Sequence, residues 1–214
     1  MDDGIKARNL VKYVEAAMNS GSVKAIVLRV DSPGGDALAA DLIAEVLKKG
    51  KGKKPIIVSQ GYVAASGGYW LSMFADTIVA APNTITGSIG VIGSFMFNKT
   101  LKQELGMSVD HVQKGKFADL GFGATLPLIG LSIPDRDFTD EELKMAETGI
   151  KTLYKGFIEK VALGRNKSFN EIEKIAQGRV WSGSDGLKNG LVDVLGGLDD
   201  AIKIALQKAN LTNS

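Results

Sequence analysis

The chain has 214 residues, of which 44% are hydrophobic and 23% are charged, and its formal net charge is +2. These proportions fit one globular domain, and so small a net charge excludes the strong positive field of nucleic-acid-binding proteins. Cysteine is absent, which excludes disulfides and thiolate metal sites. No apolar run approaches the ~18 residues of a membrane span, so we expect a soluble chain. We expect it to need neither a metal nor another cofactor.

The first half of the chain alternates between helix-like and strand-like segments. Apolar residues at helical spacing and β-rich runs predict the following elements in order: a helix at 9–17, a strand at 25–30, a break at 31–35, a helix through Leu38, Leu42 and Val46, a strand at 56–59, a helix at 64–74, a strand at 77–81 and a glycine-rich turn at 86–90. Strands that alternate with helices are typical of a parallel sheet. The sequence therefore predicts an α/β fold.

Beyond Gly106 the pattern changes. The segment 122–133 is apolar and glycine-rich without a clear period, and we interpret it as a loop or a partner-contacting surface. The capping-box pattern at 139–142 precedes apolar residues at helical spacing as far as Val161, which predicts a long helix. A second capping box at Ser168 predicts a shorter helix, and 199–209 predicts a terminal one. Because no linker or internal repeat is visible, we expect residues 1–214 to form a single domain.

Ser66 is the first candidate for chemistry, because it stands between Ala65 and Gly67 at a predicted strand-to-helix junction. A serine hydroxyl becomes a nucleophile only when a base takes its proton, and acyl transfer also needs hydrogen-bond donors for the developing oxyanion. The Gly67 amide is the natural first donor. The second could come from the turn at Gly34 and Gly35, because glycines let backbone amides turn toward a ligand. Tight helix packing is the alternative explanation for the small residues around Ser66.

The base is harder to identify. His111 is the only histidine, and a lone histidine is more often a surface or packing residue, so we do not expect a Ser-His-Asp triad. The alternative is a serine-lysine dyad, in which burial lowers the pKa of the lysine until the neutral amine can accept a proton. Lys114 and Lys116 are candidates, although both are equally explained as surface lysines.

Four segments carry a resemblance to a known family: VKAIVLRVDSPGGD, GYVAASGGYWLSMFAD, TITGSIGVIG and GRVWSGSDGLKNGLVDVLGG. In this order and at these spacings the chain resembles the signal peptide peptidase A family, also called protease IV, from about residue 5 to residue 207. The resemblance implies a Clp-protease/crotonase-like fold, a serine-lysine mechanism and cleavage of leftover signal peptides. It also implies that the full-length protein is anchored in the cytoplasmic membrane with an extracytoplasmic catalytic domain.

The resemblance assigns roles to four residues: Ser66 as nucleophile, Gly35 and Gly67 as the oxyanion amides, and Ser88 as the hydrogen-bond partner of the catalytic lysine. One position departs from the family pattern. Short members carry the lysine in a Gly-x-x-Lys segment, and at the corresponding spacing this chain has Ala118. Long members have two tandem repeats, with the lysine in the first and the serine in the second. We therefore interpret the chain as the C-terminal repeat of a long member, nearly inactive until an N-terminal repeat supplies the lysine.

The expected partners are extended apolar peptides such as signal peptides, the N-terminal repeat and further copies in a homo-oligomer; nucleic acid is not expected. Two other functions stay open. A crotonase-like acyl-CoA enzyme would use the same pair of amides, but it needs a carboxylate acid/base, and none stands out near Gly34 or Ser66. A non-catalytic assembly domain would explain the missing lysine, but not the presence of Ser66, Ser88 and the glycine turns.

Overall fold

The computed structural model describes residues 6–95, 104, 106, 110, 112–120, 123–126, 131–134 and 136–211. They belong to two compact units, one made of 1–91 with 154–214 and the other of 92–153. Helix α5 (Asp140–Arg165) contributes residues to both units. The assignment of residues 1–214 to a single peptidase domain stays a prediction. Within the described ranges, no helix is both long enough and apolar enough to cross a membrane.

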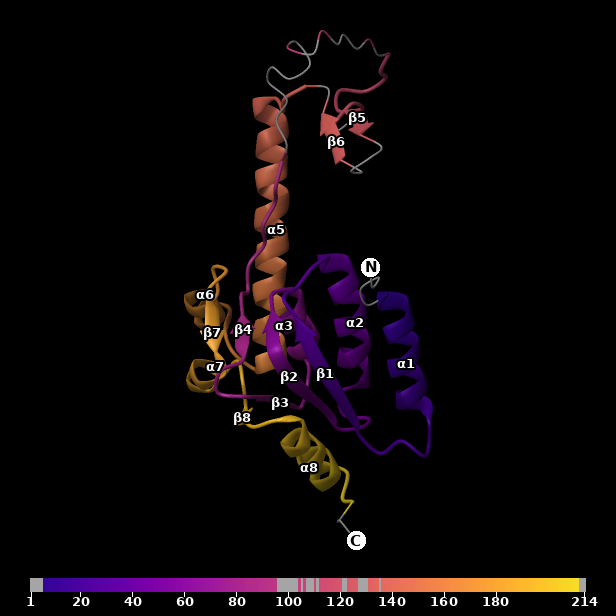
Figure 1. Ribbon diagram of the computed structural model, residues 1–214, viewed down its shortest axis with the longest axis vertical. Helices are drawn as coiled ribbons and strands as arrows, with labels where there is room; N and C mark the ends of the chain where they lie inside the picture. Colours follow the sequence, from indigo (N-terminus) through magenta and orange to yellow (C-terminus); the bar gives the residue numbers. More distant parts are fainter. Residues whose placement is uncertain are drawn as a thin grey trace. The chain divides into compact units, whose positions relative to one another are not determined.

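The first unit is built around one sheet with helices on its two faces (Figure 1). Its described strands are β1 (Ile26–Ser32), β2 (Ile56–Ala65), β3 (Thr77–Ala80), β4 (Ile85–Gly87), β7 (Val180–Ser182) and β8 (Val194–Leu195). Its described helices are α1 (Ala7–Asn19), α2 (Ala37–Gly50), α3 (Gly67–Ser72), α6 (Phe169–Ile175), α7 (Gly183–Asn189) and α8 (Leu198–Lys208), together with the last part of α5.

Strand β2 is the centre of this sheet. It pairs in parallel with β1, with β3 through residues 57–59 and with β4 through residues 63–65, and β3 pairs in parallel with β8. The prediction of a parallel sheet of alternating strands and helices is therefore confirmed for these strands. Strand β7 is the exception, because it runs antiparallel to β4.

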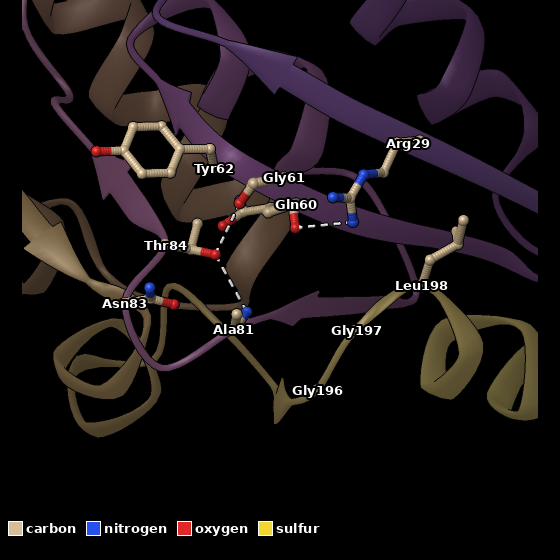
Figure 2. Close-up of a pocket in the computed structure, with 10 residues that line it drawn as sticks. All are labelled: Arg29, Gln60, Gly61, Tyr62, Ala81, Asn83, Thr84, Gly196, Gly197 and Leu198. Atoms are coloured by element: carbon tan, nitrogen blue, oxygen red, sulfur yellow. Dashed lines mark hydrogen bonds between the residues drawn. The ribbon is translucent and has the colours of Figure 1, made fainter.

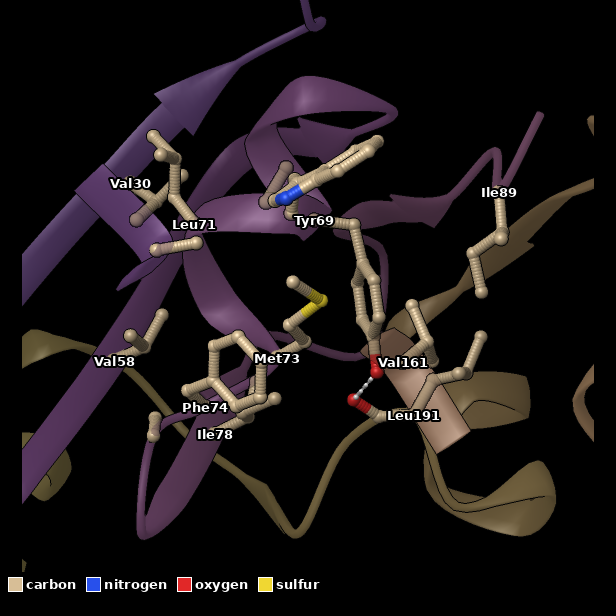
Figure 3. Close-up of a cluster of buried hydrophobic side chains, with 14 of the residues drawn as sticks. Val30, Val58, Tyr69, Leu71, Met73, Phe74, Ile78, Ile89, Val161 and Leu191 are labelled. Atoms are coloured by element: carbon tan, nitrogen blue, oxygen red, sulfur yellow. Dashed lines mark hydrogen bonds between the residues drawn. The ribbon is translucent and has the colours of Figure 1, made fainter. Parts of the chain in front are cut away.

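The core lies on both faces of β2. Ile56 and Val58 join the large apolar cluster under α1, α2 and α3, whereas Ile57, between them, packs with Ala201 of α8 on the opposite face. This alternation follows from the two-residue period of a strand. The large cluster includes Tyr69, whose hydroxyl donates a 3.0 Å hydrogen bond to the Leu191 carbonyl (Figure 3). A continuous β-rich run is thus buried on both sides, as expected for a central parallel strand.

The structure corrects the predicted boundary between strand and helix at the end of β2. The expected helix at 64–74 begins only at Gly67 and ends at Ser72, because Ala64 and Ala65 continue the strand and pair with β4. Likewise β1 continues through Ser32 into the segment expected to be a break. The expected turn at 86–90 begins inside β4. In each case pairing with a distant strand extends the β structure beyond the local turn signal.

The second unit contains a two-stranded antiparallel sheet of β5 (Gly123–Leu126) and β6 (Leu131–Pro134). The interpretation of 122–133 as a loop is therefore wrong for residues 123–126 and 131–133, whereas residues 122 and 127–130 lie outside the described part of the chain. The alternative interpretation, a partner-contacting surface, stays a prediction. The first turn of α5 has the expected capping box, because the Thr139 amide donates to the Glu142 carboxylate and the Glu142 amide donates to the Thr139 hydroxyl. Arg136 binds both Glu142 and Asp119, which ties the turn at 114–120 to this helix end.

Candidate active site

Ser66 stands between the last residue of β2 and the first residue of α3, and its backbone is strained. Its φ of 51° and ψ of −118° lie where few residues other than glycine are found. Two hydrogen bonds hold this conformation: the Ser66 amide donates to the Gly87 carbonyl at 2.9 Å, and its carbonyl accepts from the Trp70 amide at 2.9 Å. A serine on a sharp strand-to-helix turn presents its hydroxyl outward at the end of the sheet, beside the first amides of a helix.

Ser88 occupies the equivalent position on the neighbouring strand. Ala65 and Gly87 are register partners in β2 and β4, so Ser66 and Ser88 each directly follow one member of the pair. Ser88 also has a positive φ, 47°. Its amide donates to the Arg179 carbonyl at 2.8 Å, and its hydroxyl lies 3.5 Å from the Gly178 carbonyl. The structure therefore brings the two predicted serines to the same end of adjacent parallel strands.

The Gly34-Gly35 turn lies against this junction. A Cβ atom added at Gly34 would lie 2.8 Å from the Ser66 Cβ and 3.1 Å from its hydroxyl oxygen, and the φ of Gly34 is +119°. A Cβ added at Gly67 would lie 3.2 Å from the Gly35 amide nitrogen. Only glycines permit this approach, and the approach brings the amides of Gly35 and Gly67 to one place. Two donors to one oxyanion must lie close together, so this proximity agrees with the predicted roles of both amides.

A cavity of about 380 Å³ opens beside the two amides. Its apolar wall comes from α2 and α3, with Ala40, Ile43 and Leu71 among the lining residues, and Gly35 and Gly67 line it as well. The Asp36 carboxylate caps α2 by accepting from the Ala39 amide at 2.7 Å, so the start of this helix is fixed directly after Gly35. The cavity is large enough for an apolar side chain beside these two amides.

The candidate bases belong to the other unit. Lys116 is exposed and forms an ion pair with Glu141, and Lys114 and Ala118 are exposed as well. His111 lies outside the described residues. Within the described part of the chain, the Ser66 hydroxyl has no side-chain hydrogen-bond partner, so Ser66, Ser88, Gly35 and Gly67 assemble in the first unit without a base. The catalytic roles of all four stay predictions.

Two residues of the site were missed by the reasoning from sequence. The carbonyls of Gly178 and Arg179 hold Ser88, and Gly178 also packs on the glycine turn, because a Cβ at Gly90 would lie 2.8 Å from its Cα. These residues begin the fourth segment that carries the family resemblance, but nothing local indicates that they contact Ser88, which lies far away in the sequence.

A second cavity, of about 340 Å³, lies elsewhere in the first unit (Figure 2). Arg29 donates to the Gln60 carbonyl at 3.2 Å, and the Thr84 hydroxyl donates to the Gly61 carbonyl at 2.8 Å while accepting from the Ala81 amide. These hydrogen bonds join neighbouring strands and a turn. None of the four predicted site residues lines this cavity.

The fold and the site define a class. The chain is similar to a ClpP1 mutant from Listeria monocytogenes, with a TM-score of 0.59 and 16% identity over 92% of this chain and 86% of that one, so its fold is that of the Clp proteases. Residues 48–212 match the pattern of peptidase family S49, and the chain belongs to that family. The predicted Clp-protease/crotonase-like fold and the predicted signal peptide peptidase A resemblance are both confirmed.

Named relatives agree with this assignment. The chain is 40% identical over 97% of its length to "Serine protease SPPA, chloroplastic" of Arabidopsis thaliana, and 39% identical over 94% of its length to "Protease 4" of Haemophilus influenzae. It spans only 29% and 31% of the lengths of these two proteins.

Proposed function

We propose that the chain is the serine-bearing part of a serine peptidase in which Ser66 is the nucleophile. The observation that carries the proposal is the strained Ser66 conformation beside the amides of Gly35 and Gly67. A strained residue persists only where its surroundings fix it, and such residues cluster at functional sites. Membership in a peptidase family supports the same reaction class.

In the proposed reaction the Ser66 hydroxyl oxygen attacks the carbonyl carbon of a peptide bond. The proton of the hydroxyl passes to a neutral lysine amine, and the carbonyl oxygen becomes an oxyanion that accepts from the amides of Gly35 and Gly67. The lysine then gives its proton to the leaving amine as the C–N bond breaks, and water hydrolyses the acyl-enzyme. The Ser88 hydroxyl, beside Ser66 on the adjacent strand, orients the lysine.

We propose that another repeat of a longer protein supplies this lysine. Ala118 stands at the position of the lysine in short family members, and a methyl group cannot accept a proton. The alternatives within the chain are poor, because a serine-lysine dyad depends on a buried lysine and both Lys114 and Lys116 are exposed. The named relatives are more than three times as long as the matched region, which leaves room for a second repeat.

The proposed substrates are extended apolar peptides, of which cleaved signal peptides are the class that the family resemblance suggests. The apolar cavity beside Gly35 and Gly67 supports this proposal, because it can take one side chain of a peptide whose backbone binds in strand-like form. Assembly into a homo-oligomer and anchoring of the full-length protein in the cytoplasmic membrane are further parts of the proposal.

The nucleophile is tested in the full-length protein with Ser66→Ala, using Ser22→Ala as the control at an exposed serine far from the junction. Cleavage of an unfolded apolar peptide should disappear with Ser66→Ala and persist with Ser22→Ala. An acyl-CoA ligand that binds with micromolar affinity, or a Ser66→Ala protein that cleaves at the normal rate, would overturn the assignment.

The origin of the base is tested by comparing this chain with its Ala118→Lys, Lys114→Ala and Lys116→Ala variants on a peptide ester. General-base help is worth about 10²–10⁴-fold in rate, so the unmodified chain should turn over slowly and the missing repeat should restore activity. Robust turnover that is abolished by Lys116→Ala would instead make the chain a self-contained dyad.

A further inference from the structure

The two amides proposed to bind the oxyanion lie at the starts of two different helices, and the spacing between these helices must be held. Gly35 directly precedes the cap of α2, and Gly67 is the first residue of α3. Because a Cβ at Gly67 would come within 3.2 Å of the Gly35 amide nitrogen, a small change in how α2 packs on α3 moves one donor relative to the other. The reaction depends on donors that are already in place when the oxyanion forms.

A partly buried polar contact joins the two helices within about two turns of the amides. The Trp70 indole Nε1 donates a 3.0 Å hydrogen bond to the Asp41 carboxylate of α2. The Trp70 amide in turn donates to the Ser66 carbonyl, so the indole and the nucleophile belong to the same turn of α3. Trp70 is only 6% exposed, and a buried indole N–H needs an acceptor.

Helix α5 fixes both partners from outside. The Phe157 ring stacks on Trp70 at a centroid distance of 4.2 Å, and Lys160, three residues further along, binds the carboxylate of Asp41 and also that of Glu45 at 3.0 Å. Burial lowers the pKa of Lys160, but its hydrogen bonds to these two carboxylates outweigh burial and raise the pKa overall. The ammonium therefore stays charged and holds the Asp41 side chain in place.

We propose that Asp41 is a positioning residue that sets the relative placement of the Gly35 and Gly67 amides through its hydrogen bond to Trp70. The kinetic consequence rests on the function proposed above, whereas the placement of the amides does not. Asp41 touches neither the substrate nor the reacting atoms; it acts through the packing of α2 on α3.

The placement is tested by the ¹H–¹⁵N chemical shifts of Gly35 and Gly67 in the protein. Trp70→Phe keeps the aromatic ring on Phe157 but removes the N–H donor, and Asp41→Ala removes the acceptor; both should shift the two amide signals. Asp41→Asn keeps an oxygen that can accept the indole hydrogen bond and should restore the wild-type shifts. Glu45→Gln is the matched control, because it removes the other carboxylate partner of Lys160 without touching Trp70.

The kinetic test uses the full-length protein and a peptide ester. Removing an oxyanion donor costs about 10²–10³-fold in kcat, so a displaced donor should cost about tenfold in Trp70→Phe and Asp41→Ala, with KM unchanged. Amide shifts and kcat that stay at wild-type values in both variants would overturn the proposal, as would equal effects in Glu45→Gln. If Trp70→Phe and Asp41→Ala shift the two amide signals but Ser66→Ala does not inactivate the full-length protein, the proposed function is wrong and the positioning role of Asp41 stands.

Discussion

Gly34→Ala tests how closely the glycine turn approaches Ser66. The new methyl group would lie 2.8 Å from the Ser66 Cβ and 3.1 Å from the Gly67 amide nitrogen, and neither atom can rotate away. The matched control is Gly52→Ala, because Gly52 also has a positive φ, +82°, but no heavy atom lies within 4 Å of the position that its new methyl group would take. Both substitutions place an alanine at a positive φ, and only Gly34→Ala adds a collision with Ser66.

The magnitudes follow from these two terms. An alanine at positive φ costs about 1–2 kcal/mol, which is the whole expected effect of Gly52→Ala on the free energy of unfolding. Overpacking costs about 1–3 kcal/mol more, so Gly34→Ala should be clearly the more destabilising of the two. The methyl group also lies 3.1 Å from the Ser66 hydroxyl oxygen, so in the proposed reaction it should hinder the approach of a substrate carbonyl.

Urea denaturation of the two variants measures the stability difference, and labelling of Ser66 by a phosphonylating probe in the full-length protein measures access to the hydroxyl. Gly34→Ala should lose labelling, and Gly52→Ala should keep it. Equal losses of stability in the two variants, together with normal labelling of Gly34→Ala, would refute the inferred approach of the turn to Ser66.

Three further predictions concern the core, the helix cap and Ser88. Phe157 is 1% exposed, so Phe157→Ala should lower the free energy of unfolding by about 3–5 kcal/mol. Leu163 is exposed, so Leu163→Ala should change the free energy of unfolding by less than about 0.5 kcal/mol. Equal losses of stability in urea denaturation would contradict this burial pattern. The side-chain hydrogen bond from Arg136 lowers the pKa of Glu142 from 4.5 to about 2, so its carboxylate stabilises the fold above about pH 4.5 and this contribution disappears as the pH falls toward 2; the destabilisation by Glu142→Gln should therefore shrink over that range, and a pH-independent difference would be evidence against it. Ser88→Ala and Ser88→Gly should both lower kcat of the full-length protein, and the loss should be smaller than the ~10²–10⁴-fold that a general base contributes. Because glycine accepts the 47° φ freely, normal activity in Ser88→Gly would show that the backbone conformation matters and the hydroxyl does not.

Local patterns determined much of the secondary structure. The capping box at Ser168 is present as expected, with the Glu171 amide donating to the serine hydroxyl and the Ser168 amide donating back to the Glu171 carboxylate. The long α5 and the terminal α8 also agree with the apolar spacing. Caps and helical periodicity depend on residues within one or two turns, so the sequence alone carries the information.

Strand ends and very short strands, which depend on distant partners, were predicted poorly. Ala64 and Ala65 were expected to begin a helix, but pairing with β4 keeps them in β2. The hairpin of β5 and β6 lacks a period that distinguishes it from a loop. Strand β7 is three residues long and exists through its pairing with β4. Short strands are stabilised by their neighbours rather than by their own propensity, so their sequences do not indicate them.

The candidate site likewise has residues that the sequence indicated and contacts that only the tertiary structure revealed. Ser66 and the Gly34-Gly35 turn were recognisable from sequence because only small residues allow a close backbone approach, and glycine also marks conformations that other residues avoid. The tertiary structure decided what holds them: the carbonyls of Gly178 and Arg179 at Ser88, and the contact between Trp70 and Asp41 across two helices. These contacts join residues far apart in the chain, and a hydrogen bond forms only where folding brings its donor within about 3 Å of its acceptor.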